Sequence, residues 1–352
     1  MSVTEQDILA ALRTIEDPDL HRDIVSLGFV QTPVIDGDTV SVSIVLTTPA
    51  CPVRDQMQTE ATEKLLALPG VRTANVTMEA NVVQHRAAGG QPIEGVRNII
   101  AIASNKGGVG KSTVSANLAV ALASLGARVG LMDADITGPN IPTMMGIVQG
   151  AQAESGGGGL RVEERFGVKV CSIGFVLPRG TPVVWRGPMI GTAVRQLLHD
   201  INWGELDYLL IDLPPGTSDA SMSMAQEAPI SGVVIVSTPQ DIALEDAAKA
   251  VSMFDKLNVP IFGVIENMSD FACPHCNERT EIVGHGGARS AAEDLGLEFL
   301  GELPLDLATR QAADAGQPIV VAQPESLQAA AFLDVAKQVA ARCSVLEYAT
   351  GA

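Results

Sequence analysis

Short apolar runs alternate with helical segments along the chain from Val96 onward. Several runs are apolar at nearly every position, as in residues 233–236, which is typical of strands buried on both faces of a parallel sheet. The pattern predicts an α/β fold in which a mainly parallel sheet is flanked by helices. The expected strands cover residues 98–103, 128–133, 168–173, 207–213, 232–238 and 260–266.

Residues 1–86 carry a separate, self-contained pattern. Thr4 and Asp7 can cap a helix that begins between them. The further expected elements are a half-buried strand over 40–45, a helix over 52–68 and a strand over 71–83. The segment therefore predicts a small α/β domain, which a linker of residues 87–96 joins to a second domain of residues 97–352.

Composition narrows the kinds of partner. The chain of 352 residues is 46% hydrophobic and has a net charge of -18, whereas a broad nucleic-acid surface needs clustered Lys and Arg. Aromatic residues, which stack on bases, make up only 3%. No basic segment followed by an apolar core opens the chain, and no apolar run reaches the length of a membrane span. We therefore expect a cytoplasmic protein with no nucleic-acid partner and no membrane partner.

Residues 104–113 read Ser-Asn-Lys-Gly-Gly-Val-Gly-Lys-Ser-Thr and lie between an apolar strand and an Ala- and Leu-rich helix. Glycines in such a loop let successive N–H groups converge on phosphate oxygens at a helix N-terminus. Lys111 is expected to reach the outer phosphates of a nucleotide, and the Ser112 hydroxyl to ligate Mg²⁺. The strict pattern lacks its first glycine, and a glycine-rich turn without a ligand is the alternative. The expected nucleotide-binding residues of the loop are Asn105, Gly107, Gly108, Val109, Gly110, Lys111, Ser112 and Thr113.

Carboxylates follow two of the apolar runs, at the edge where a parallel sheet gathers its ligands. Asp212 ends one run and is expected to hold Mg²⁺, directly or through water. Asp133 ends another run and is expected to support the ion without touching it, while Asp135, further out, is the candidate for positioning the attacking water. Each Asp could instead cap a helix, but the phosphate loop upstream favours the nucleotide site. Gly216 lies in the segment that we expect to switch on hydrolysis.

Motifs spread over nearly the whole chain resemble one family. They are residues 106–113, 133–139, 185–188, 203–208, 212–217, 238–240 and 267–269, the last running into Cys273-Pro274-His275-Cys276. On these motifs the chain is similar to the Mrp/ApbC family of iron-sulfur cluster carriers, which belong to the deviant Walker A ATPases together with MinD and ParA-type proteins. The amino-terminal segment resembles the small iron-sulfur assembly domain that is often fused to such carriers.

The resemblance implies a face-to-face homodimer that binds ATP and hydrolyses it slowly. Lys106 matches the signature lysine, which crosses the dimer interface and stabilises charge on the partner's transferring phosphoryl group. Lys106, Lys111 and Asp135 are therefore the expected catalytic residues, and Asn267 matches the family's adenine-contacting Asn. The implied activity is the transfer of iron-sulfur clusters to target apoproteins, with a cluster-assembly scaffold as a further partner.

Cys273 and Cys276 form the one CxxC motif of the chain. By themselves they are compatible with a redox dithiol, half of a zinc site, a pair of cluster ligands or unused residues. A tetrahedral metal or cluster site needs four ligands, which two subunits around a twofold axis would supply. The resemblance implies that these cysteines hold a 4Fe–4S cluster bridging two subunits. His275 is expected to be a solvated turn residue.

Cys51 precedes the expected helix over 52–68, where the helix dipole would lower the pKa of its thiol. A role in handling clusters or contacting client proteins is weighed against a merely capping, unreactive residue. Cys171 lies in an apolar strand and Cys343 on the last helix, and both are expected to be inert.

Two other functions stay open on the sequence alone. A MinD/ParA-like ATPase that acts as a spatial-positioning switch would need a basic membrane helix or a basic DNA face. The last expected helix, over 326–342, has only Lys337 and Arg342 as basic residues, which is a poor membrane signal. The second alternative is an ATPase switch with a structural zinc ion at the CxxC motif.

Overall fold

The computed structural model describes residues 3–82, 84, 90–136, 138–148, 150, 160–176, 187–216, 219–273, 276 and 278–350. Its backbone forms two compact units, Met1–Gln84 with Ala340–Ala352, and His85–Val339. Part of the expected linker over 87–96 lies outside the described residues. So do Thr137, Trp185, Arg186, Thr217, Pro274 and His275 from the motifs above.

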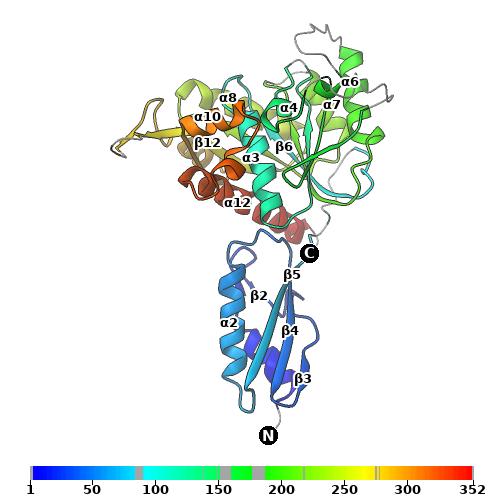
Figure 1. Cartoon of the computed structure of the whole chain (residues 1–352), viewed down its shortest axis with the longest axis vertical. Helices are drawn as coiled ribbons and strands as arrows, with labels where there is room; N and C mark the ends of the chain where they lie inside the picture. Colours follow the sequence, from blue (N-terminus) through cyan, green and yellow to red (C-terminus); the bar gives the residue numbers. More distant parts are fainter. Residues whose placement is uncertain are drawn as a thin grey trace. The chain divides into compact units, whose positions relative to one another are not determined.

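The first unit contains a three-stranded sheet in the order β3-β4-β5 (Figure 1). Its elements are α1 (Glu5–Leu12), β1 (Glu16–Asp17), β2 (Arg22–Asp23), β3 (Val34–Asp36), β4 (Thr39–Leu46), α2 (Arg54–Leu66) and β5 (Thr73–Ala80). Alternate residues of β4, from Val40 to Leu46, are buried, because successive side chains of a strand point to opposite faces. The capping box expected at Thr4 and Asp7 is present at the start of α1.

The second unit is built on a sheet that has nine strands among the described residues. They are β6 (Val96–Ala103), β7 (Val129–Asp133), β8 (Glu163–Arg165), β9 (Val168–Ser172), β10 (Leu206–Asp212), β11 (Gly232–Ser237), β12 (Ile261–Ala272), β13 (Arg279–Thr280) and β14 (Phe299–Leu305). Their order is β13-β12-β11-β6-β10-β7-β9-β8, with β14 also against β12. All pairs are parallel except β8 with β9 and β12 with β13. The predicted α/β fold with a mainly parallel sheet is confirmed.

Helices cover the sheet on both faces. Side chains of α6 (Gly187–Arg195), α7 (Asp219–Glu227), α8 (Asp241–Lys256) and α9 (Gly287–Asp294) join one core cluster with strand residues such as Ile99 and Ile211. Figure 1 shows α3 and α12 in front of the strands. The helices of that group are α3 (Lys111–Ser124), α4 (Ile141–Met144), α10 (Leu307–Asp314), α11 (Ile319–Ala322) and α12 (Leu327–Thr350). Two short helical turns, over Ile173–Phe175 and Gln196–Asp200, complete the described helices.

Some elements depart from the expected pattern. β12 does not stop at residue 266 but continues to Ala272, through Asn267, Ser269 and Asp270, which are only 1% to 8% exposed. Buried polar residues break the apolar run by which a strand is found, so this half of β12 was missed. β14 was missed as well, because Gly301, Glu302 and Pro304 interrupt its apolar positions. α12 continues past the expected end at residue 342 to residue 350.

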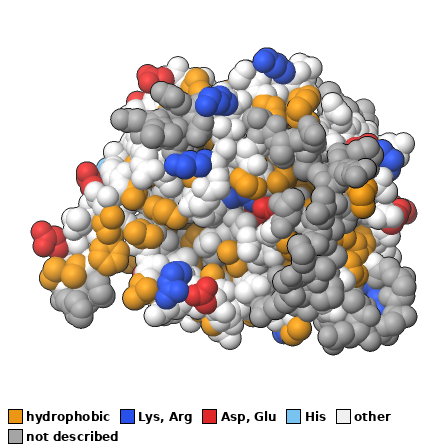
Figure 2. Space-filling model, turned by 90° about the horizontal axis from the view of Figure 1, so that it is seen from above, with side chains coloured by type: hydrophobic (Ala, Val, Ile, Leu, Met, Phe, Trp, Pro, Cys, Tyr) orange, Lys and Arg blue, Asp and Glu red, His pale blue; other side chains and the backbone are white. Residues whose placement is uncertain are grey.

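Within the described ranges, no helix combines the length and the apolar character that a membrane crossing requires. On the face shown in Figure 2, the Lys, Arg, Asp and Glu side chains stand as separate spots among uncharged surface. Charges of both signs are therefore interspersed on the part of that face that the structure describes.

Candidate functional site

The phosphate loop lies between β6 and α3, at the carboxyl ends of the parallel strands. Gly110 caps α3 with a left-handed backbone (φ 83°), and Gly108 has φ 84°. Residues that carry a Cβ atom rarely adopt such φ values, so the path of the loop requires both glycines. A Cβ atom at Gly110 would also collide with Nδ2 of Asn267. Among the described residues no side chain caps α3, so its first N–H groups suit the binding of an anion.

Asp212, at the end of β10, is the centre of a polar network beneath the loop. Lys111 Nζ lies 2.7 Å from Asp212 Oδ1, and Ser115 Oγ donates to the same oxygen at 2.6 Å. Ser112 Oγ donates to Asp212 Oδ2 at 2.7 Å. The Lys111 and Asp212 side chains are only 6% and 1% exposed, and the Lys111 ammonium has no aligned hydrogen-bond partner among the described residues. An ammonium with three donors and no aligned partner fits phosphate oxygens.

Asp133 lies beside Asp212, because β7 and β10 are paired in register at these two residues. The Asp133 carboxylate is fully buried. It accepts hydrogen bonds from Asp135 N at 3.1 Å, Ile141 N at 3.3 Å and Ser172 Oγ at 3.1 Å. Burial raises the pKa of Asp133 well above its ordinary value, and the negative charge of Asp212 raises it further. A cation held by Asp212 would offset the repulsion between the two carboxylates.

The donor atoms of this network suit Mg²⁺. They are hard oxygens, from the Ser112 hydroxyl and the Asp212 carboxylate, with the Asp133 carboxylate behind them. Softer metals prefer sulfur or imidazole ligands, and neither belongs to this set. The residues present therefore fit a magnesium ion.

Three other residues singled out in the sequence lie on the segments that adjoin this network: Asp135, Lys106 and Gly216. Asp135 is half-buried just beyond β7, and its Oδ1 accepts a hydrogen bond from Gly138 N at 3.2 Å. Lys106 is exposed on the loop, and its carbonyl oxygen accepts a hydrogen bond from Ser104 Oγ at 3.1 Å. Gly216 N donates to Ser104 O at 2.8 Å, which ties the segment after β10 to the start of the loop. The structure thus gathers the loop and the carboxylates, and leaves Lys106 on the surface.

A cavity of about 310 Å³ opens beside Gly110 and Thr113. Asn267 lines it, and its Nδ2 donates to Val109 O at 2.8 Å, so the end of β12 is tied to the phosphate loop. The opposite wall comes from β14, α10 and α12, and includes Pro304, Leu305, Asp306, Thr309, Arg310 and Phe332. Apolar walls with a few polar groups beside a phosphate loop have the chemistry to bind a nucleoside.

Cys273 and Cys276 fall between β12 and β13, two strands that pair as an antiparallel hairpin (Figure 1). β13 pairs with the end of β12, and Cys273 N donates to Glu278 O at 2.9 Å across the turn. Cys273 is half-buried and Cys276 is exposed. In the part of the chain that the structure describes, no group of three or more His, Cys, Asp and Glu side chains is arranged to hold a metal ion.

Cys51 corrects an expectation. α2 begins only at Arg54, and burial, together with two nearby carboxylates, raises the pKa of the Cys51 thiol to about 11. The predicted lowering of this pKa was wrong, because loss of hydration disfavours the thiolate more than the helix start favours it. Cys171 and Cys343 are buried, and burial raises the pKa of Cys171 to about 12.

Two residues of the network were not predicted. Ser115 follows Lys111 by four positions, so the spacing of neighbours on a helix face could have indicated it. Ser172 has no such signal, because its contact with Asp133 arises from the parallel pairing of β7 with β9.

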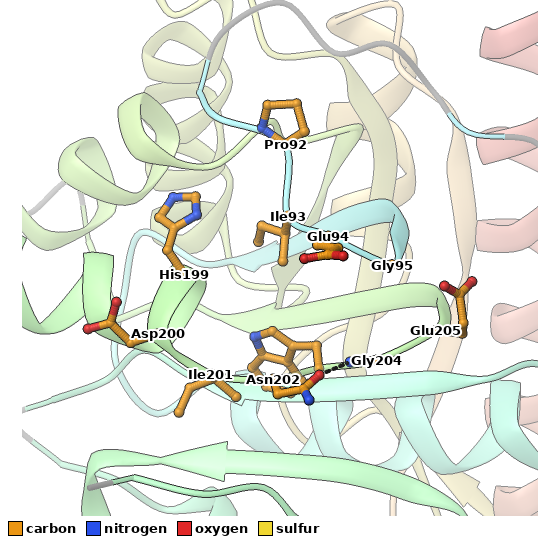
Figure 3. Close-up of a pocket in the computed structure, with 11 residues that line it drawn as sticks. Pro92, Ile93, Glu94, Gly95, His199, Asp200, Ile201, Asn202, Gly204 and Glu205 are labelled. Carbon is orange, nitrogen blue, oxygen red and sulfur yellow. Dashed lines mark hydrogen bonds between the residues drawn. The ribbon is translucent and has the colours of Figure 1, made fainter.

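A larger cavity, of about 550 Å³, lies at the amino ends of β6 and β10 (Figure 3). Residues 92–95 and 199–205, which lead into β6 and β10, form its walls. Figure 3 shows the side chains of Glu94, Asp200 and Glu205 around it. Because ligands of a parallel sheet gather at the carboxyl ends of its strands, size alone does not mark this cavity as the nucleotide site.

Two family models match the chain. One, described as the NUBPL iron-transfer P-loop NTPase, matches residues 95–340, and the other, described as an iron-sulfur cluster assembly protein, matches residues 5–78. The iron-sulfur cluster carrier protein of Deinococcus radiodurans is 46% identical, over 96% of this chain and 95% of its own length.

Solved structures share the fold of the second unit. A nucleotide-binding protein of Archaeoglobus fulgidus, in complex with ADP, is 40% identical and has a TM-score of 0.55 over 64% of this chain and 88% of its own. The cell division ATPase MinD of Pyrococcus furiosus is 25% identical, with a TM-score of 0.53 over 69% of this chain and 98% of its own. With one family model spanning most of its length and a carrier relative aligned over nearly all of it, the chain belongs to the iron-transfer P-loop NTPase family of iron-sulfur cluster carrier proteins.

Proposed function

We propose that this protein carries iron-sulfur clusters to target apoproteins and that ATP binding and slow ATP hydrolysis control the carrier. One observation carries the proposal: the strand β12 runs from the phosphate loop, which its Asn267 contacts, to the hairpin of Cys273 and Cys276. A nucleotide site on a strand that leads directly to a half-buried and an exposed thiol suits a carrier whose cargo is handled according to nucleotide state.

On the nucleotide side, ATP is the substrate. The N–H groups of residues 105–113 and the Lys111 ammonium would bind its phosphates, and the cavity beside Asn267 would take its adenine. Ser112 and Asp212 would hold Mg²⁺, with Asp133 supporting them. The ion, when bound, neutralises charge on the phosphates. Asp135, in the turn beyond β7, orients the attacking water.

Lys106 acts on the nucleotide of a second subunit in a homodimer. Its exposure on the loop supports this assignment, because an exposed ammonium is open to contact from a second subunit. A cation delivered in this way stabilises charge on the transferring phosphoryl group, as an arginine finger does.

The cluster is the cargo. Each chain contributes two thiolates, from Cys273 and Cys276, and a 4Fe–4S cluster with four cysteine ligands needs two chains. The dimer that Lys106 requires would therefore also complete the cluster site. A cluster held at an exposed hairpin by two ligands from each chain would be labile, which suits transfer to a client apoprotein and loading from an assembly scaffold.

We assign residues 1–86 to an assembly-type domain, residues 87–96 to a linker and residues 97–352 to the ATPase and carrier domain. The match of residues 5–78 to the assembly family supports the first assignment. The half-buried Cys51 is assigned an accessory role in client contact.

Anaerobic reconstitution tests the proposal. The protein is expected to take up about four irons per dimer, and Cys273→Ala with Cys276→Ala is expected to lose them while still binding ATP. Cys51→Ser is the matched control, because it removes a thiol outside the hairpin and should keep the full iron content. Unchanged iron in the double variant would contradict the carrier assignment.

A further inference from the structure

β12 is interrupted between the nucleotide site and the cysteine hairpin. Its register against β14 pairs Asn267 with Leu303 and Phe271 with Leu305. Residues 268–270 of β12 therefore lie opposite Pro304 alone. Because proline has no N–H group to donate, the hydrogen bonds between β12 and β14 are interrupted at Pro304, and the extra residues of β12 form a bulge.

The bulge has a strained backbone and a buried hydroxyl that lacks a bond. Met268 has φ 60°, a left-handed conformation that residues other than glycine rarely adopt. Ser269 is only 1% exposed, and its Oγ has no hydrogen-bond partner among the described residues. Such features persist only where the surroundings enforce them, and they recur at segments that switch between conformations.

One end of the bulge belongs to the nucleotide site. Asn267 donates to Val109 O of the phosphate loop at 2.8 Å, and Met268 lines the cavity assigned to the adenine. The glycine that caps α3, Gly110, leaves room for Asn267 that no other residue would leave. A nucleotide entering this cavity therefore has to displace or contact the first residues of the bulge.

The other end belongs to the hairpin. Asp270, whose side chain is 8% exposed, accepts a hydrogen bond from Arg279 Nη1 at 2.9 Å, and Arg279 lies on the returning strand β13. Cys273 N donates to Glu278 O at 2.9 Å a short way beyond. These two links join both arms of the hairpin to the last residue of the bulge, so the arms would move together.

We propose that the Met268–Asp270 bulge is a hinge that couples nucleotide occupancy of the cavity to the position of Cys273 and Cys276. Met268 and Arg279 are its positioning residues: the first senses the nucleotide, and the second transmits the change to the hairpin. The inference rests on the proposed function, and it adds the route by which one site influences the other.

The test uses the full-length, cluster-free protein under reducing, anaerobic conditions. The rate at which N-ethylmaleimide modifies Cys273 and Cys276 is followed by peptide mass spectrometry, with and without a nonhydrolysable Mg-ATP analogue. In the wild type the analogue is expected to change the Cys273 rate by at least about fivefold, the lower end of typical coupling between two sites. The change should not depend on protein concentration, whereas shielding by dimerisation would.

Arg279→Gln releases the hairpin from Asp270 without touching the cavity. It is expected to bind the analogue as the wild type does and to lose the nucleotide effect on Cys273, and Arg279→Lys should recover part of it. Arg195→Gln is the matched control, because Arg195 forms a comparable 2.7 Å ion pair with Glu227 and its side chain is 60% exposed, against 66% for Arg279. This control should keep the full effect.

Met268→Gly offers a second variant, because glycine accepts the left-handed backbone while lacking the side chain in the cavity. At a saturating concentration of the analogue, the modification rate of Cys273 in this variant should equal the rate without the analogue.

A wild type that binds the analogue and takes up iron, yet shows equal Cys273 rates with and without the analogue, would overturn the hinge and leave the proposed function intact. Failure of the proposed function is seen separately, as absence of iron uptake or of nucleotide binding. An Arg279→Gln protein with the full effect would also overturn the hinge.

Discussion

Replacing Ser115 by Ala removes one hydroxyl from the network beneath the phosphate loop, and this hydroxyl has two acceptors: Asp212 Oδ1 and, at the longer distance of 3.0 Å, the carbonyl oxygen of Lys111. Ser115 is fully buried on α3 and donates to Asp212 Oδ1 at 2.6 Å. The substitution removes no charge and leaves only a small space. It therefore isolates the contribution of one hydroxyl to the position of Asp212.

The size of the effect follows from what Asp212 retains. A hydrogen bond to a charged group contributes about 1.5–3 kcal/mol to stability. Asp212 Oδ1 keeps Lys111 at 2.7 Å, so the oxygen is not left without a partner, and we expect the lower value of about 1.5 kcal/mol. For a unit of this size, that loss lowers the Tm by about 3–6 °C. Because Ser112 keeps its own bond to Asp212 Oδ2, the Kd for Mg-ATP should rise by less than about tenfold.

Urea unfolding followed by tryptophan fluorescence measures the loss. Both tryptophans of the chain, Trp185 and Trp203, belong to the second unit, so the signal reports the unit that contains the network. Ser124→Ala is the matched control: its hydroxyl also lies on α3, but it is exposed and donates to the Ala121 carbonyl oxygen at 2.8 Å. The control should cost less than about 0.5 kcal/mol. Equal losses in the two variants would show that Ser115 does not hold Asp212 in place.

The remaining predictions concern Lys106 and Cys51. Lys106→Ala should lower ATP hydrolysis by about 10³-fold or more while sparing ATP binding. Mixing it with Lys111→Ala should restore turnover, because a mixed dimer contains one site that keeps its own Lys111 and receives Lys106 from its partner; no restoration would contradict action in trans. With a pKa of about 11, the Cys51 thiol should react with maleimide at pH 8 about 100-fold more slowly than a thiol of pKa near 9, and its rate should rise with pH up to about 11. Modification as fast as at the exposed Cys276 would refute the pKa.

Much of the nucleotide site could be predicted because its signals are local. The glycines, Lys111 and Ser112 follow one another in a single loop, and Asp212 ends an apolar strand. The contacts among them could not be predicted. Ser115 reaches Asp212 across 97 positions of the chain, a distance that only the packing of α3 against β10 closes.

The effects of burial on polar groups also could not be predicted from the sequence. The position of Cys51 before a helix suggested a lowered pKa, whereas the folded unit withdraws the thiol from water and raises the pKa. Likewise the expected strand ended at residue 266, before the polar residues Asn267, Ser269 and Asp270, yet the fold continues β12 through all three and buries them.

The sequence by itself determined the mainly parallel α/β fold, the phosphate loop and the family resemblance, because apolar periodicity and short motifs act over a few neighbouring residues. Only the tertiary structure decided which polar groups share one network, where β12 bulges, and how far pKa values move. These depend on strand register and on exclusion of water, which arise when residues far apart in the chain pack together.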